Sequence, residues 1–210
     1  MEPKITIDAR MLGPSGIGTC LRNLLDQFAV LDHEFCFRVI SAHADELLRL
    51  PRERFQIVRA SAPIYSFSEQ WEIARLARGT DLLYIPHYNI PYFYRGKLVV
   101  TIHDLTHITC RQFFPGFAAH HYARFMLGAA TGHAQRIVTD SQFSRRSIQE
   151  HFRVGDGKIR VIYPPPSALV LQPSPTSGLA TELGISGDYI LYAGALKKHK
   201  NLEALVRAYA

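Results

Sequence analysis

Cysteine is scarce in this chain of 210 residues, which contains only Cys20, Cys36 and Cys110. The three are far apart and form no C-x-x-C pair, so the sequence offers neither a disulfide framework nor a cysteine zinc site. Free thiols of this kind are typical of proteins in a reducing compartment. We therefore expect a cytoplasmic protein with reduced cysteines.

Long hydrophobic runs are missing as well. No uninterrupted apolar stretch approaches the ~20 residues that a membrane-spanning helix needs. Residues 1–8 (MEPKITID) are a charged lead-in to a short strand and lack the features of a signal peptide. Any membrane contact should therefore be peripheral, at the inner face of the membrane.

The composition is that of an ordinary soluble globular protein, with 47% hydrophobic and 20% charged residues. At ~100–200 residues per domain, the length allows one full domain and a remainder. The net charge of +6 either favours acidic partners, such as phosphorylated substrates or anionic lipids, or belongs to a solvated basic surface. Nucleic acid is not predicted as a partner, because no nucleic-acid-binding module is recognisable.

Short β-branched runs alternate with helix-like segments along the first 163 residues. Strands are expected at 4–9, 34–41, 54–59, 81–86, 97–102, 136–139 and 158–163. Helices are expected at 17–31, 44–50, 68–78, 117–132 and 142–152. This alternation predicts an α/β domain with a mostly parallel sheet that helices cover on both faces. Ligands of such sheets bind outside the carboxyl ends of the strands.

The second part of the chain changes character. Residues 164–187 contain the proline clusters PPP at 164–166 and PSP at 173–175, which predict an interdomain connection with one helical turn near 179–183. A new strand at 189–193, a loop at 194–200 and a helix at 201–210 follow. One such unit cannot bury its own apolar faces, so we expect residues 188–210 to begin an incomplete second domain after a first domain at 1–163.

A glycine-rich loop, GPSGIG at 13–18, follows the first strand and opens into a helix. Glycines let backbone N–H groups approach an anion, and the helix N-terminus favours negative charge. The loop is not a dinucleotide fingerprint, because Leu21 stands where the third glycine belongs, and no Gly-Lys-Ser/Thr follows as in a P-loop. A phosphate site around Gly16 and Gly18 and a simple tight turn both remain open.

His103 and Asp104 follow the strand at 97–102, at the edge where ligands bind. A histidine there can donate to a sugar hydroxyl or a phosphate, and a neighbouring carboxylate can orient it. We predict this pair as catalytic; a structural histidine is the alternative. The string His103-Asp104-Leu105-Thr106-His107 is a poor zinc motif, since it lacks the helix and the glutamate of H-E-x-x-H.

Two further strand-end loops carry candidate ligand groups. In the segment 140–146 (DSQFSRR), Ser141 and Arg145 are cleft candidates, although an N-cap at Asp140 or Ser141 would also explain the polar cluster. In the loop 194–201 (GALKKHKN), backbone amides with Lys197 and Lys200 suit a diphosphate. A solvated basic loop is the alternative there.

Several strings along nearly the whole chain resemble family 4 glycosyltransferases of the GT-B type. They are IDAR at 7–10 with SGIG at 15–18, VTIHD at 100–104, RIVTDS at 136–141 with FSRR at 143–146, KIRVIY at 158–163, and YILYAG at 189–194 with HKNL at 199–202. The resemblance implies two Rossmann-like domains that face a cleft, the first mainly for the acceptor and the second for the nucleotide-sugar.

The resemblance also implies roles for individual positions. Gly16 and Gly18 match the loop near the donor phosphates, His103 matches a histidine that contacts the transferred sugar or the acceptor, and Lys200 pairs with the diphosphate. Family members often have an arginine where this chain has Ala195. Their second-domain motif E-x(7)-E would lie beyond residue 210, so the resemblance implies a truncated chain. No D-x-D string is present, which agrees with a family that requires no metal and no other cofactor.

We therefore expect a retaining glycosyltransferase of the hexosyl or mannosyl type, with a nucleotide-sugar donor and a glycan or lipid-linked acceptor. This chain alone should be inactive, and a downstream chain would supply the rest of the donor domain. The alternative is a non-catalytic module that binds a glycan or a lipid-linked acceptor. For a membrane-proximal version, residues 111–117 (RQFFPGF) combine aromatic and basic groups, although core packing would also explain them.

Overall fold

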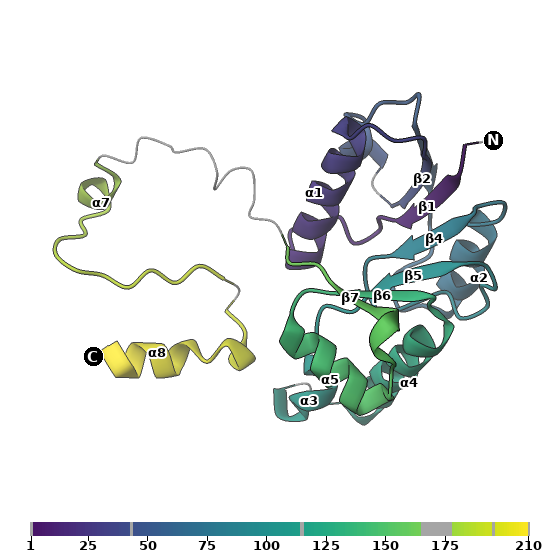
Figure 1. Ribbon diagram of the computed structural model, residues 1–210. Coiled ribbons are helices and arrows are strands. Elements are labelled where there is room, and N and C mark those ends of the chain that lie inside the picture. The colour runs from purple at the N-terminus through teal and green to yellow at the C-terminus, as the bar shows by residue number, and fades with distance from the viewer. Residues whose placement is uncertain (1, 43, 114–115, 165–177, 195, 210) are drawn as a thin grey trace.

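The computed structural model of the protein describes residues 2–42, 44–113, 116–164, 178–194 and 196–209. Its centre is a sheet of seven strands in the order β3-β2-β1-β4-β5-β6-β7 (Figure 1). The strands are β1 (Lys4–Asp8), β2 (Cys36–Ser41), β3 (Phe55–Arg59), β4 (Leu82–Ile85), β5 (Leu98–Thr101), β6 (Arg136–Thr139) and β7 (Ile159–Val161). All neighbouring strands run parallel, which confirms the predicted α/β class.

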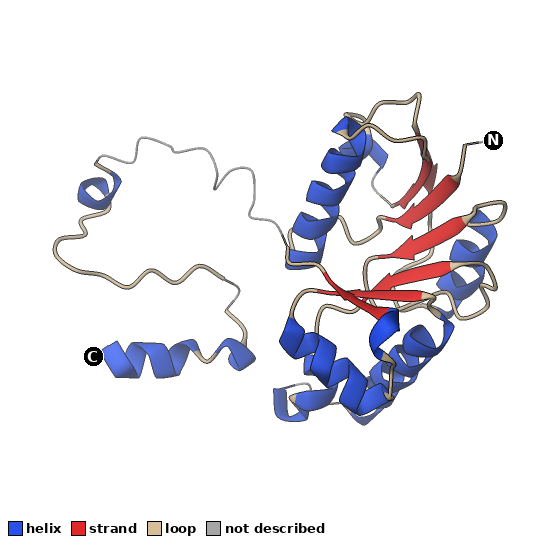
Figure 2. Cartoon of the chain, in the orientation of Figure 1, coloured by secondary structure: helices blue, strands red, loops and turns tan. Residues whose placement is uncertain are grey.

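Helices connect the strands on both faces of the sheet (Figure 2). They are α1 (Gly16–Val30), α2 (Phe67–Leu76), α3 (Thr106–Thr109), α4 (Phe117–His133) and α5 (Gln142–Phe152), with the 3-10 turns η1 (Ala44–Leu47), η2 (Arg111–Phe113) and η3 (Asp156–Lys158). Helix α1 lies on one face, and α2, α4 and α5 pack on the other. The arrangement is Rossmann-like, as expected. None of the helices within the described ranges is long and apolar enough to cross a membrane.

Two apolar cores hold the helices to the sheet. On the side of α1, Leu21 and Leu25 lie one helical turn apart and pack with Ile7 of β1. On the opposite side, α2, α4 and α5 pack on β4, β5 and β6 through a larger cluster that includes Leu83 and Val100. The strands carry continuous apolar runs, as is typical of a parallel sheet with helices on both faces.

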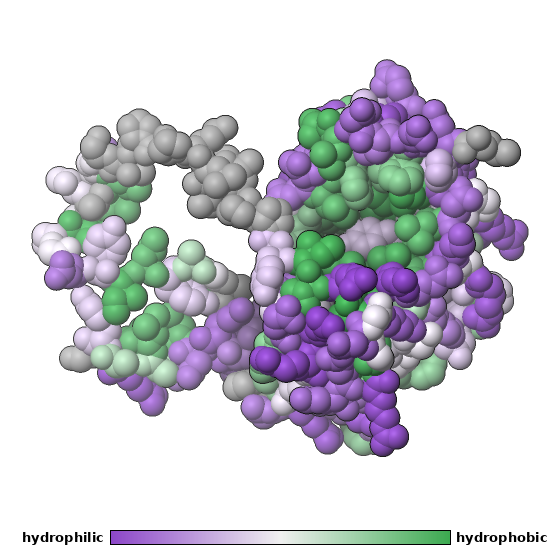
Figure 3. All heavy atoms as spheres, in the orientation of Figure 1, coloured by the Kyte–Doolittle hydropathy of each residue, from purple (hydrophilic) through white to green (hydrophobic). Residues whose placement is uncertain are grey.

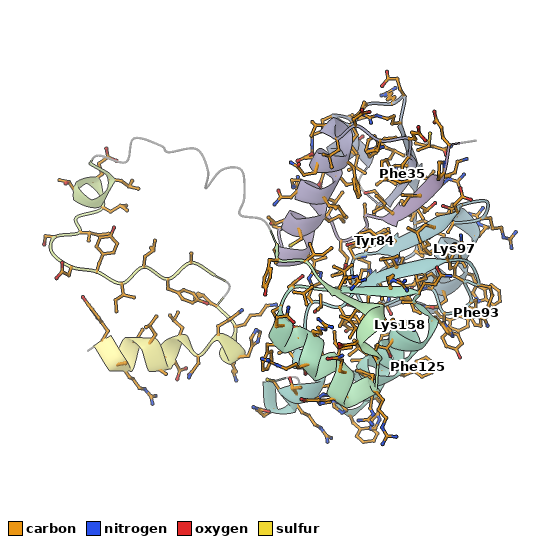
Figure 4. All side chains as sticks on the ribbon, viewed as in Figure 1. Phe35, Tyr84, Phe93, Lys97, Phe125 and Lys158 are labelled. Carbon is orange, nitrogen blue, oxygen red and sulfur yellow. The ribbon has the colours of Figure 1, made fainter. Side chains whose placement is uncertain are left out.

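The side of the sheet that carries α1 is only partly covered. Half-buried side chains of β4, β5 and β6, among them Tyr84, Val99 and Val138, line an apolar pocket of about 370 Å³ beside α1. The space-filling view in Figure 3 shows this area as a hydrophobic hollow. Within this pocket, the hydroxyl groups of Tyr84 and Thr101 share a hydrogen bond of 2.8 Å; Tyr84 is labelled in Figure 4.

The C-terminal segment departs from the prediction. Residues 165–177, which contain most of the predicted connection, lie outside the described residues, and α7 (Leu179–Glu182) matches the expected helical turn. The expected strand at 189–193 is wrong, because these residues are extended but pair with no strand in the described chain. A strand needs a neighbour to satisfy its N–H and C=O groups, and the segment has none. The turn η4 (Lys198–Lys200) and helix α8 (Leu202–Tyr209) follow, close to the predicted loop and helix.

Candidate functional site

The candidate site lies at the carboxyl edge of the sheet, where the strand order reverses. Strands β2 and β3 extend to one side of β1, whereas β4 to β7 extend to the other. In a parallel sheet the loops at such a switch point form a crevice. The loops after β1, β4, β5 and β6 meet there, and they contain most of the predicted site residues of the first domain.

The glycine loop after β1 packs tightly against the start of α1. Ser15 caps the helix, and its hydroxyl accepts a hydrogen bond from the Gly18 N–H at 3.1 Å. A Cβ atom at Gly18 would lie 2.0 Å from the carbonyl oxygen of Gly13, whereas one at Gly16 would meet nothing within 4 Å. Gly18 is therefore required by the packing of the loop, and exposed Gly16 lies at the open N-terminus of the helix.

Replacing Gly18 with alanine should lower the free energy of unfolding by about 1–3 kcal/mol, because its methyl group meets a backbone oxygen. Gly16→Ala is the matched control: the site is open, and alanine suits a helix better than glycine by about 0.5–1 kcal/mol. Urea denaturation of both variants checks this. Equal stabilities would mean that the loop does not press on α1 as described.

His103, just after β5, connects three loops of the site. Its Nδ1 lies 2.7 Å from Asp140 Oδ2 and its Nε2 lies 2.9 Å from the carbonyl oxygen of Pro86. Both partners are acceptors, so both bonds form together only when each ring nitrogen carries a proton. The backbone oxygen of His103 accepts from the Ser144 hydroxyl of α5 at 2.9 Å. The ring is thus held in a fixed orientation at the crevice.

The carboxylate that orients His103 is Asp140, and not Asp104 as predicted. Asp104 is exposed, and its Oδ1 accepts from the Thr106 N–H at 2.8 Å, at the start of α3. The prediction relied on Asp104 following His103 directly in the sequence. Consecutive residues at a strand end, however, point in different directions. Asp140 also lies near Cys20 of α1, and burial together with the Asp140 charge raises the pKa of the Cys20 thiol. The start of α1 therefore faces His103 and Asp140 across the pocket described above.

The other two cleft candidates of this edge have structural partners. Ser141 is the N-cap of α5, where its hydroxyl accepts from the Ser144 N–H at 3.0 Å. Arg145 forms an ion pair with Asp156 at 2.9 Å. The N-cap alternative is thus realised at Ser141, and a ligand role for Ser141 and Arg145 stays a prediction.

Lys197 and Lys200 do not line the pocket that contains His103. Burial and, to a smaller extent, the Lys197 charge lower the pKa of His107, so Lys197 lies near that residue. Both lysines are exposed on the C-terminal segment, which Figure 1 draws apart from the sheet. Their loop would be fixed only at the end of a paired strand, and the strand at 189–193 does not form. Ala195, which the family resemblance also concerns, lies outside the described residues. The diphosphate roles of both lysines stay predictions.

A buried ionic network lies beneath the crevice, and the sequence analysis did not identify it. The Arg10 guanidinium donates to both carboxylate oxygens of Asp8, at 2.9 and 2.7 Å, and to Glu69 Oε2 at 2.9 Å. All three side chains are almost fully buried. Burial lowers the pKa of Arg10, but the bonds and charges of Asp8 and Glu69 outweigh it and hold this pKa above its ordinary value. Burial raises the pKa of Glu69 against the opposing effect of Arg10.

His87, just after β4, adjoins this network. Its Nδ1 accepts from the Asn89 N–H at 3.1 Å. Its buried Nε2 has no hydrogen-bond partner among the described residues and lies 3.9 Å from Asp8 Oδ2. Burial lowers the pKa of His87 to about 4, so the ring is neutral at pH 7. A neutral histidine and an ion pair thus support the floor of the crevice.

Three tyrosines, two from loops and one from α4, meet above this floor. The Tyr65 and Tyr122 rings form an edge contact at 6.2 Å, and the Tyr65 hydroxyl shares a hydrogen bond with Tyr88. Tyr65 has a φ of 66°, a left-handed conformation rare for residues other than glycine, and its N–H donates to Glu69 at 2.9 Å. The Tyr122 hydroxyl donates to Asn89 at 2.5 Å, and burial raises the pKa of Tyr122 to about 12.

This tyrosine cluster offers partly exposed rings and hydroxyls, and the Asp104 charge is one of the causes that raise the pKa of Tyr88, after burial, Tyr65 and Tyr122. Such groups can pack on the face of a sugar ring and bond its hydroxyls, since a tyrosine combines an apolar body with a polar tip. Among the described residues, no three His, Cys, Asp or Glu side chains gather as a metal site would require. The described side chains of the edge are a histidine–carboxylate pair, aromatic rings and hydroxyl groups.

Comparison with known proteins supplies the family. Residues 14–165, which include all of the glycine loop except Gly13, together with His103 and Asp140, match the family model described as Glycosyltransferase Family 4. The chain belongs to this family. No curated protein matches the sequence.

Solved structures agree on the fold. HepE from Anabaena, in complex with UDP and glucose, has a TM-score of 0.58 and 19% identity, with 87% of this chain and 50% of HepE covered. HepE in complex with UDP-glucose has a TM-score of 0.58 and 18% identity, with 86% of this chain and 50% of HepE covered. A glycosyltransferase from Rickettsia africae has a TM-score of 0.51 and 13% identity, with 89% of this chain and 51% of that structure covered. This family 4 chain thus has the fold predicted from its sequence and spans about half the length of these structures.

Proposed function

We propose that this family 4 chain is the acceptor-side part of a retaining hexosyl or mannosyl transferase. Its donor is a nucleotide-sugar, and its acceptor is a glycan or a lipid-linked sugar presented at the inner face of a membrane, which the chain contacts peripherally. The proposal rests on one observation: His103, its partner Asp140, the start of α1 and the tyrosine cluster share the carboxyl edge of the sheet. Residues 1–163 act as the first domain, and 188–210 begin the second, after the connection at 164–187.

The donor phosphates are proposed to lie near the N-terminus of α1. Exposed Gly16 leaves the first turn of the helix open to an anion, and the helix dipole favours negative charge there. Negative charge grows on the leaving diphosphate as the glycosidic bond breaks, so fixed N–H donors stabilise the transition state more than the ground state. Lys197 and Lys200 would add positive charge once the second domain is complete. UDP and glucose in HepE are consistent with this donor class, and we propose that no metal or other cofactor is required.

The acceptor is proposed to lie on the tyrosine cluster. The rings of Tyr65, Tyr88 and Tyr122 come from the loops after β3 and β4 and from α4, so they form one surface at the crevice. The His103 ring, fixed by Asp140, would contact the transferred sugar or the acceptor hydroxyl. The exposed carboxylate of Asp104 is close in sequence and available for the same hydroxyl groups.

The 210-residue chain alone should turn over nucleotide-sugar at or near the background rate, because most donor contacts would come from a second domain. Release of UDP from UDP-glucose, measured with and without added glycan acceptors, checks this. Robust turnover by the isolated chain would refute the division of roles proposed here. Addition of a downstream chain that carries E-x(7)-E should restore turnover.

Restored turnover gives the test of the site itself. His103→Ala should lower kcat by roughly a hundredfold, the scale expected for a lost transition-state contact, and Asp104→Asn reports whether that carboxylate takes part. If the downstream chain restores nothing, while the 210-residue chain binds a glycan through Tyr65 and Tyr122 without donor, the chain is a non-catalytic binding module instead.

A further inference from the structure

A group of exposed aromatic side chains lies on the face formed by α2, α4 and the loop between β4 and β5. We call it the aromatic face; its members are Phe67, Trp71, Phe93, Phe117 and Phe125, which are between 36% and 76% exposed. Scattered apolar side chains are normal on a protein surface, but a contiguous group of this size marks an interaction site.

Ring contacts connect three members of the aromatic face, while the ring of Phe117 contacts His121. Phe67 and Trp71 lie one turn apart on α2, and Trp71 stacks on Phe93 at 4.4 Å. Tyr92 touches both Phe93 and Phe125, at 5.7 and 5.4 Å between ring centroids. The opposite sides of α2 and α4 pack on the sheet, so these rings are surplus to the core. Figure 4 shows Phe93 and Phe125 on the same side of the molecule, with Lys97 near them.

The exposed charges beside the aromatic face are mostly basic. Helix α4 and residues 88–97 contain no aspartate or glutamate but carry the exposed side chains of Arg95, Lys97 and Arg124. Of the two carboxylates of α2, Glu69 is buried against Arg10. Glu72 accepts from the N–H groups of residues 61 and 62, which do not cancel its charge. Aromatic rings beside an excess of basic groups suit the headgroup level of an anionic bilayer.

We propose that the aromatic face docks on an anionic lipid bilayer, with its rings among the headgroups and its basic side chains on lipid phosphates. This inference rests on the proposed function, which includes a peripheral membrane contact. It adds which surface makes that contact and which lipid charge the surface prefers. Phe67 and Phe117 begin α2 and α4 at the carboxyl edge of the sheet, so the docked bilayer would border the tyrosine cluster. Of the predicted segment 111–117, Phe117 belongs to the face, while residues 114 and 115 lie outside the described residues.

Trp71 allows a direct test, because it is the only tryptophan of the chain. Vesicles of phosphatidylglycerol and phosphatidylcholine are titrated into the 210-residue protein, and vesicles of phosphatidylcholine alone serve as the comparison. We expect a blue shift of the Trp71 emission and its quenching by brominated acyl chains with the anionic vesicles. Binding to the neutral vesicles should be at least roughly tenfold weaker.

Matched variants locate the contact. Phe93→Ser with Phe125→Ser should weaken vesicle binding by roughly tenfold or more, since each ring would lose its burial in the bilayer. The control is Phe35→Ser with Phe143→Ser: these rings are also exposed, and Figure 4 places Phe35 far from Phe93. It should bind as the unchanged protein does. Lys97→Gln with Arg124→Gln should weaken binding to anionic vesicles alone, and circular dichroism verifies that each variant is folded.

Three results would overturn the proposal. The first is a Trp71 emission that does not change when anionic vesicles are added. The second is an equal loss of vesicle binding in the Phe93/Phe125 and Phe35/Phe143 variants. The third is a dimer, seen by sedimentation, that dissociates in the Phe93/Phe125 variant while vesicle binding persists. The last would make the face an interface between copies of this chain. The vesicle assay contains no sugar nucleotide, and turnover is scored with a soluble acceptor, so failure of one proposal is distinct from failure of the other.

Discussion

Replacing Arg10 with methionine should lower the free energy of unfolding by about 3–5 kcal/mol, the cost of leaving buried charges without their partner. The guanidinium is bonded to Asp8 and Glu69, and all three side chains are at most 2% exposed. Methionine fills a similar volume but leaves two carboxylates together in an apolar surrounding. Urea denaturation at pH 7 measures the loss.

Arg49→Met is the matched control for this prediction. Arg49 pairs with Asp26 at 2.8 Å, much as Arg10 pairs with Asp8 at 2.7 Å, but both partners of the Arg49 pair are about half exposed. An exposed pair should contribute about 0–1 kcal/mol. Adding Asp8→Asn and Glu69→Gln to Arg10→Met should recover much of the loss, since the uncompensated charges are removed. Similar losses in Arg10→Met and Arg49→Met would mean that burial does not set the cost.

The strands and helices of the first domain could be predicted because local pattern and tertiary environment agree there. The runs of β4 and β5 are apolar on both faces, which is typical of a parallel sheet with helices on both sides. Helix α1 follows from Ser15 at its N-cap and from Leu21 and Leu25 at helical spacing. The segment at 189–193 has the same local pattern as a strand, but strand formation depends on a neighbour that sequence pattern does not supply.

The candidate site was only partly predictable, because its decisive contacts join distant residues. The strand-end rule placed His103 correctly at the edge, but its partner Asp140 lies 37 residues further along the chain. Likewise, Arg10 meets Glu69 across 59 residues. The string Ile7-Asp8-Ala9-Arg10 did carry a signal: two charged residues at the end of an apolar strand have to be paired if they are buried. The tyrosine cluster gave no sequence signal, since its rings come from two separate loops and from α4.

Acid should destabilise the protein through His87, and the sign follows from its lowered pKa. In the folded chain the pKa of His87 is about 4, whereas its ordinary value is 6.5. Between these values the unfolded chain binds a proton that the folded chain does not, so stability falls as the pH drops from about 7 to 4. At 1.36 kcal/mol per pKa unit, the His87 contribution to this loss is about 3 kcal/mol.

His87→Asn isolates this contribution from the other groups that titrate in the same range. The asparagine side-chain oxygen can still accept from the Asn89 N–H, as His87 Nδ1 does. Urea denaturation at pH 7 and pH 4.5 should show a smaller acid loss in His87→Asn than in the unchanged protein, and His133→Asn, at an exposed histidine of α4, should show the full loss. If His87→Asn and the unchanged protein lose stability equally, burial in the folded chain does not disfavour protonation of His87. The His87 ring at the floor of the crevice would then be accessible to water.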